Sequence, residues 1–125
     1  MDNRPIGIFD SGVGGLTVAK EILKALPNEN IVYFGDTARV PYGDKSKEVV
    51  TKYSKQIVRF LLTKNVKAII TACNTVSSNS LDDLRSEFDV PFVGVVEPGV
   101  KSVINTTVNK KVGIIGTEAT IRSCM

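Results

Sequence analysis

Apolar residues along this chain occur in short continuous runs and in longer runs with helical spacing. A continuous apolar run predicts a strand that is buried on both faces, whereas apolar residues at every third or fourth position predict a helix that buries one face. The expected strands are 5–10, 30–36, 67–72, 92–96 and 111–117. The expected helices are 16–26, a long one through 49–61, 75–88, 100–107 and one that begins after residue 120.

Strands that alternate with helices predict an α/β fold in which helices cover both faces of a parallel sheet. Because parallel strands end at one edge of the sheet, the residues that close the strands should meet there. These are Asp10, Asp36, Cys73, Glu97 and Thr117. For Asp36 and Glu97, a structural role as a loop or helix-capping carboxylate is the favoured interpretation.

A weak domain boundary is expected near Glu97-Pro98-Gly99, because the polar stretch 104–111 separates the first four expected strands from the fifth. We therefore expect a first α/β domain at 1–98, followed at 99–125 by a linker helix and the opening strand of an incomplete second domain. The last helix runs into Met125 without a capping residue or a closing glycine, which indicates a truncated chain.

Composition places the chain among globular proteins, with 125 residues, 42% hydrophobic residues and a mean hydropathy of +0.07. The sequence has neither an apolar run long enough to span a membrane nor a signal peptide, so we expect a cytoplasmic protein. The net charge of +3 comes without an aromatic-interleaved basic stripe, which argues against nucleic-acid binding. Histidine is absent, so proton chemistry must use Cys, Asp, Glu, Lys or Tyr.

Cys73 stands where an apolar run passes into small polar residues, a pattern typical of a strand, a turn and a helix start. A thiol at a helix N-terminus is favoured as the thiolate, which is its reactive form. The alternative is that Cys73 fills the core, as free cysteines often do. Cys124 is interpreted as incidental, and no disulfide framework is expected.

Asp10 precedes a glycine-rich turn formed by Ser11-Gly12-Val13-Gly14-Gly15. The backbone of such a turn can approach a ligand closely, and its N–H groups favour a carboxylate or a phosphate. Dinucleotide binding is the rival interpretation, but Thr17 replaces the third glycine and Asp10 would face the pyrophosphate. Asn74 and Thr75 add short donors beside the thiol, although Thr75 could equally cap a helix.

Four motifs occur in order: IFDSGVGGLT at 8–17, YFGDTARVPYG at 33–43, TACNT at 71–75 and GIIGTEATI at 113–121. Together they closely resemble the glutamate racemase family, within the aspartate/glutamate racemase superfamily. The resemblance covers the chain from about Pro5 to Ser123.

The resemblance implies a cofactor-independent isomerase that interconverts L- and D-glutamate and supplies D-glutamate for bacterial peptidoglycan. One cysteine thiolate removes the α-proton of the substrate, and a second thiol delivers a proton to the opposite face. By this resemblance Cys73 is catalytic and Asp10 assists its proton transfers. The implied substrate-binding residues are Asp10, Ser11, Pro41, Tyr42, Gly43, Asn74, Thr75 and Thr117, and neither a metal nor a cofactor is expected.

The chain departs from the family in length and in one motif. Family members resembling it are about twice as long, with two facing α/β domains and a second cysteine in a Cys-Thr-His motif. That motif is absent here, and the neighbours of Cys124 do not match it. We expect an amino-terminal portion that by itself gives little or no racemisation.

Two other functions remain open at the level of sequence: a racemase for aspartate, and a non-catalytic module that binds a small anion or a nucleotide. The expected partner is a small-molecule substrate, glutamate, rather than a nucleic acid or a membrane. The oligomeric state is left open, with a homodimer as one candidate.

Overall fold

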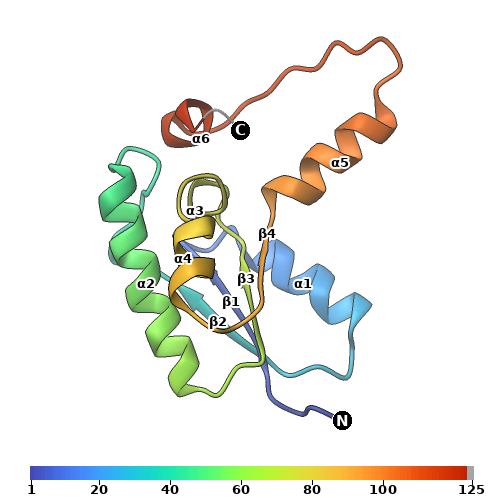
Figure 1. Ribbon diagram of the computed structural model, residues 1–125. Helices are drawn as coiled ribbons and strands as arrows, with labels where there is room; N and C mark the ends of the chain where they lie inside the picture. The colour runs from blue at the N-terminus through green and yellow to red at the C-terminus, as the bar shows by residue number, and fades with distance from the viewer. Residues whose placement is uncertain (124–125) are drawn as a thin grey trace.

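A parallel sheet of four strands forms the centre of the computed structural model, which describes residues 1–123 (Figure 1). Its strand order is β2-β1-β3-β4, so β1 and β3 are the inner strands. Ile8 in β1 lies opposite Tyr33 in β2 and Ile70 in β3. The strands are β1 (Ile6–Asp10), β2 (Ile31–Gly35), β3 (Ala68–Thr71) and β4 (Phe92–Gly94).

Helices lie on both faces of the sheet, as the sequence predicts, with α1 and α2 on opposite sides in Figure 1. No helix within residues 1–123 has the length and apolar character needed to cross a bilayer. The helices are α1 (Leu16–Ala25), α2 (Lys47–Thr63), α3 (Asn74–Asn79), α4 (Leu81–Glu87), α5 (Val96–Thr106) and α6 (Glu118–Arg122).

Alternation along β1 divides the core into two clusters. Ile6 and Ile8 pack with Ala19 of α1 on one face. Phe9 points to the other face, where it joins a larger cluster that includes Ile57 and Leu61 of α2. Burial of each such side chain contributes about 1.5–3 kcal/mol, and these two clusters hold the sheet between its helices.

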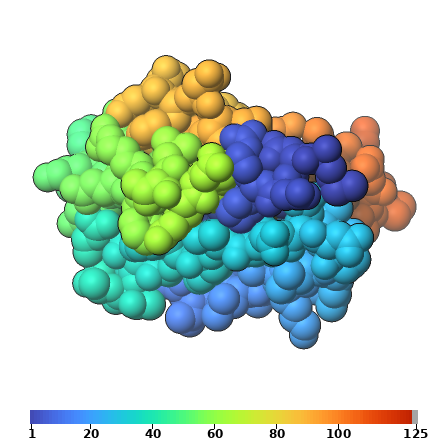
Figure 2. All heavy atoms as spheres, turned by 90° about the horizontal axis from the view of Figure 1, so that it is seen from below, coloured from blue at the N-terminus to red at the C-terminus, as the bar shows by residue number. Residues whose placement is uncertain are grey.

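The amino ends of the strands lie at the bottom of Figure 1 and face the viewer in Figure 2. There the N-terminal residues lie beside the segment that leads into β3. The Lys67 ammonium donates to the Asp2 carbonyl at 2.8 Å and pairs with Glu29 at 2.5 Å. These contacts tie three segments together at the end opposite the strand carboxyl termini.

The single helix expected at 75–88 is wrong, because it is divided into α3 and α4 at Ser80. Ser80 has a φ of −127°, and its hydroxyl lies 2.7 Å from that of Thr51 on α2. Ser77 and Asn79 also hydrogen-bond through their side chains, to the carbonyls of Thr71 and Thr75. Such side-chain bonds compete with regular helical structure, which explains the break.

The strand expected at 92–96 ends earlier, at Gly94, and the following helix begins at Val96 rather than at residue 100. Glu97, Pro98 and Gly99 therefore lie in α5 instead of forming a loop. Proline is tolerated in the first turn of a helix because its missing N–H would have no intrahelical partner there.

The strand expected at 111–117 is also wrong, because this segment has no regular secondary structure. No other strand among residues 1–123 pairs with it. Ile114 and Ile115 are consequently 73% and 99% exposed. An apolar run with high strand propensity forms a strand only where a neighbouring strand supplies its hydrogen bonds.

Candidate active site

A cleft of about 430 Å³ lies at the carboxyl edge of the sheet. Its volume is within the range of small-molecule sites. The residues named for catalysis or binding from the sequence all line this one cleft: Asp10, Ser11, Pro41, Tyr42, Gly43, Cys73, Asn74, Thr75 and Thr117.

Cys73 is a buried residue between β3 and α3, 5% exposed, and its thiol is free. Its carbonyl accepts the N–H of Ser77 at 2.9 Å, which opens the helix. Its Sγ lies 3.7 Å from Oγ of Ser11, in the glycine-rich turn. The side chain therefore packs at the edge of the larger core cluster and also borders the cleft.

Asp10, at the end of β1, is a buried carboxylate that holds the glycine-rich turn. Its Oδ2 accepts the backbone N–H of Gly15 at 2.9 Å. A Cβ on Gly15 would lie 2.6 Å from Cβ of Asp10, so this close approach requires glycine. The bond places a carboxylate under the turn and occupies one of the N–H groups that an anion would need.

Tyr42 lies in the loop between β2 and α2, and its hydroxyl donates to the Asp36 carboxylate. Arg39 donates to the same carboxylate oxygen through Nε at 2.7 Å. Burial, with the hydrogen bond to Asp36, raises the pKa of Tyr42. Asp36 thus has the structural role favoured from the sequence, and Tyr42 contributes its ring and backbone to the cleft while its hydroxyl is engaged elsewhere.

Three segments distant in sequence close one side of the cleft. The hydroxyls of Thr75 and Thr117 lie 2.9 Å apart. A Cβ on Gly43 would lie 2.6 Å from Cβ of Thr117, so the Gly43 backbone lies directly against the Thr117 side chain. Asn79 also donates to the carbonyl of Ala119 at 3.2 Å, which fixes α6 above the sheet (Figure 1).

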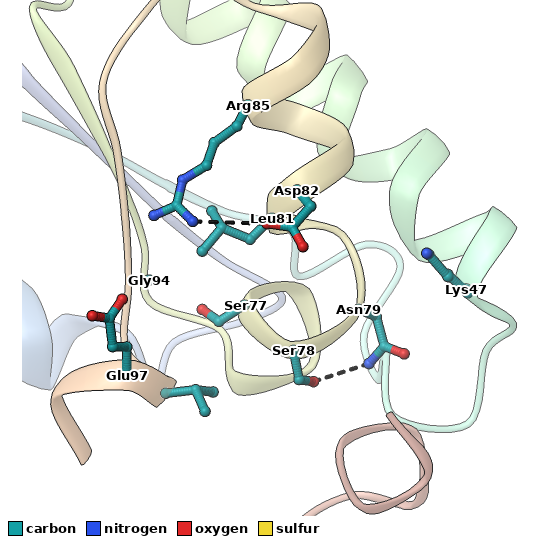
Figure 3. Close-up of a pocket in the computed structure, with 10 residues that line it drawn as sticks. Lys47, Ser77, Ser78, Asn79, Leu81, Asp82, Arg85, Gly94 and Glu97 are labelled. Carbon is teal, nitrogen blue, oxygen red and sulfur yellow. Dashed lines mark hydrogen bonds and ion pairs between the residues drawn. The ribbon is translucent and has the colours of Figure 1, made fainter. Parts of the chain in front are cut away.

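Of the five residues expected to meet at this edge, Asp10, Cys73 and Thr117 line the cleft, and Asp36 lies behind it as the partner of Tyr42. Glu97 lies elsewhere, contrary to the expectation from sequence. It lines a second cleft of about 250 Å³, with Gly94 and Arg85 (Figure 3). Its carboxylate pairs with Lys101 at 2.9 Å, and this contact lowers the pKa of Glu97. Because β4 ends at Gly94, Glu97 belongs to the first turn of α5, which explains its different location.

Several cleft residues were not anticipated from the sequence. Thr17 and Val18 could have been found, because they occupy the first turn of the helix that follows the glycine-rich turn. Val95 was assigned to a strand that ends before it.

Cys124 lies outside the described residues. Within residues 1–123, no three His, Cys, Asp or Glu side chains are grouped to hold a metal ion.

A family model described as Asp/Glu/Hydantoin racemase matches residues 6–125. The chain belongs to this racemase family. The glutamate racemase of Geobacter metallireducens is 57% identical over 123 residues, which are 98% of this chain and 46% of that relative. The chain spans about half the length of the curated racemases that it matches.

Solved racemase structures have the same fold. Glutamate racemase from Aquifex pyrophilus superposes with a TM-score of 0.93 at 53% identity, over 95% of this chain and 47% of that one. The Francisella tularensis enzyme, solved in complex with D-glutamate, gives a TM-score of 0.89 at 48% identity, over 99% of this chain and 46% of that one. The expected α/β fold with a parallel sheet is confirmed.

Proposed function

We propose that this chain carries one half of a glutamate racemase active site, with Cys73 as one of its two thiols. The observation that carries the proposal is the position of Cys73, which borders a cleft beside Ser11 and Asp10. The names of the similar enzymes support glutamate as substrate. A cytoplasmic location and a role in supplying D-glutamate for peptidoglycan belong to the same proposal.

In the proposed reaction, the Cys73 thiolate takes the α-proton of glutamate and becomes a thiol, and the electron pair of the C–H bond stays on the α-carbon. A second thiol then delivers its proton to the opposite face and becomes a thiolate. The centre is inverted with no net consumption of protons. We place the second thiol in the half of the racemases that this chain does not span, and Asp10 assists Cys73.

Binding of glutamate would use neutral donors. No lysine or arginine is among the described residues that line the cleft. Hydroxyl groups of Ser11, Thr75 and Thr117, with the Asn74 amide, can donate to the substrate carboxylates. The Asp10 carboxylate offers a negative group for the ammonium, and Pro41 to Gly43 shape the wall.

The alternative of a nucleotide-binding module is less well supported. A phosphate bound at the glycine-rich turn would meet the buried Asp10 carboxylate, and the N–H of Gly15 already donates to Asp10. The negative charges of a phosphate and of the Asp10 carboxylate would repel each other strongly in a partly buried site. The individual relatives named above are all glutamate racemases, which favours glutamate over aspartate as the substrate.

The test of the proposal is deuterium exchange at the α-carbon of L-glutamate, followed by NMR in deuterated buffer. We expect the 125-residue chain alone to bind glutamate but to give little or no D-glutamate. Adding the separately expressed second half of the Geobacter metallireducens enzyme should restore inversion. Cys73→Ala should lower the rate of the restored inversion by about a thousandfold or more, as for other essential catalytic side chains, whereas Cys124→Ala should retain it.

Two results would contradict the proposal. Rapid inversion by the chain alone would show that no second thiol is needed. Micromolar or tighter nucleotide binding in calorimetry, with no heat from either enantiomer of glutamate, would favour the binding module.

A further inference from the structure

Tyr33 lies in the middle of β2 and outside the cleft lining, yet it contacts the turn that carries Ser11. It is opposite Ile8 in the sheet, and its ring packs with the core cluster beneath α1. Its hydroxyl donates to the carbonyl of Gly12 at 2.9 Å. The Tyr33 side chain therefore connects β2 to the backbone of the glycine-rich turn.

The turn is held on β2 at a second point. A Cβ on Gly35 would lie 2.5 Å from the carbonyl oxygen of Gly12, so that oxygen rests directly against the β2 backbone. On its other side the turn is fixed by the bond from the Gly15 N–H to Asp10. Residues 12–15 are therefore held from both ends, and Ser11 lies between Asp10 and the carbonyl that Tyr33 binds.

We propose that Tyr33 is a positioning residue that, through the Gly12 carbonyl, holds the Ser11 hydroxyl beside the Cys73 thiol. The Ser11 and Cys73 side chains are 3.7 Å apart in this arrangement. Once the thiol loses its proton, the Ser11 hydroxyl can rotate and donate to the thiolate. A hydrogen bond to the charged form favours that form.

The tyrosine is suited to act as a permanent donor. Burial raises the pKa of Tyr33, and the neighbouring charges of Asp10 and Cys73 raise it further. The hydroxyl therefore keeps its proton throughout the neutral range. The ionisable groups around the thiol include Asp10 from β1, Tyr33 from β2 and Tyr42 from the following loop.

The inference concerns the proposed racemase cleft, and its biological meaning rests on that function. Its test is independent of turnover, because it measures only the chemical reactivity of Cys73. Iodoacetamide is added to the 125-residue chain from pH 6 to 10, and peptide mass spectrometry follows alkylation of Cys73 separately from that of Cys124. Circular dichroism verifies that each variant is folded.

We expect Tyr33→Phe to slow alkylation of Cys73 at pH 7 by about threefold to tenfold, the effect of losing one hydrogen bond. The pH profile should move to higher pH while the rate at its high-pH plateau is kept. Ser11→Ala should have the same effect, and the double variant should be no slower than either single variant, since both changes remove one interaction. Tyr53→Phe, on α2 against Arg39, is the matched control and should react like the parent chain.

The proposal is overturned if Tyr33→Phe keeps the parent pH profile, or if the effects of Tyr33→Phe and Ser11→Ala multiply in the double variant. A changed plateau rate with an unshifted profile would show altered access of the reagent to the buried thiol and would also overturn it. None of these results depends on whether the chain turns over glutamate.

Discussion

Single residues at the carboxyl edge of the sheet are held at distances that only glycine allows. Gly15 accommodates the Asp10 side chain, and Gly43 accommodates Thr117. Neither glycine has a positive φ, so the requirement comes from space and not from backbone conformation. The geometry of the cleft therefore depends on the absence of a Cβ atom at residues 15 and 43.

Gly15→Ala tests this dependence. The added Cβ would lie 2.6 Å from Cβ of Asp10 and 3.0 Å from Cβ of Ala72, so backbone must shift. We expect a loss of about 1–3 kcal/mol in the free energy of unfolding, as in other overpacked sites. Urea denaturation measures it.

Gly99→Ala is the matched control, because nothing lies within 4 Å of the added atom and Gly99 is inside α5. It should stabilise the chain by up to about 1 kcal/mol through helix propensity. Equal stability of the two variants would show that the turn adjusts freely.

Sequence reasoning located the cleft residues that end strands but not the direction of every side chain. Asp10 and Cys73 could be placed because strand order and parallel direction bring strand ends together. The position of the Tyr42 hydroxyl could not be predicted, because its hydrogen bond to Asp36 depends on how the intervening loop folds. The prediction for Glu97 was wrong because β4 ends at Gly94, two residues earlier than the sequence pattern indicates, so that Glu97 lies in α5.

At the scale of elements, α2 and α4 are joined by ion pairs around Glu87. The Glu87 carboxylate lies 2.5 Å from Lys55 Nζ and 2.7 Å from the Arg59 guanidinium, both on α2. The hydrogen bond with Lys55, followed by the charges of Lys55 and Arg59, lowers the pKa of Glu87 from its ordinary value of 4.5.

Glu87→Gln should make stability less sensitive to acid. Because the folded-state pKa is lowered, the contribution of Glu87 is present above pH 4.5 and is lost as pH falls below it. The parent should therefore lose more stability than the variant between pH 6 and 3 in urea titrations.

Glu21→Gln is the control for this experiment, because the pair of Glu21 with Lys24 lies within α1 and joins no second element. The stability of Glu21→Gln should have the same pH dependence as that of the parent. An identical pH dependence for Glu87→Gln and the parent would contradict the assignment.

Elements with strong periodicity were predicted well, and those decided by tertiary partners were not. The inner strands β1 and β3 are apolar on both faces, and their positions agree with the sequence. The break at Ser80 depends on Thr51, which is far away in sequence. The segment 111–117 has the composition of a strand but no neighbour within residues 1–123.

At the scale of the whole molecule, apolar side chains are exposed over α5 and the segment that follows it. Ile104, Ile114 and Ile115 are 66%, 73% and 99% exposed. Exposed apolar groups gathered in one part of a chain favour association.

We expect the chain to form concentration-dependent oligomers, including dimers, in analytical ultracentrifugation. The double variant Ile114→Lys/Ile115→Lys should shift the equilibrium toward monomer, because charged side chains resist burial in an interface. Leu23→Lys/Leu26→Lys adds the same charge at exposed positions in α1 and at its C-cap, and it should not shift the equilibrium. A parent chain that is monomeric at every concentration contradicts this prediction.

The unpaired segment between α5 and α6 also has a consequence for the cleft wall. It acts as a covalent tether that keeps Thr117 near Thr75, and a short linker gives an effective local concentration of about millimolar. Contacts too weak to hold α6 as a separate peptide can therefore hold it here. The cleft wall that contains Thr117 owes its permanence to covalent connection as much as to complementary surfaces.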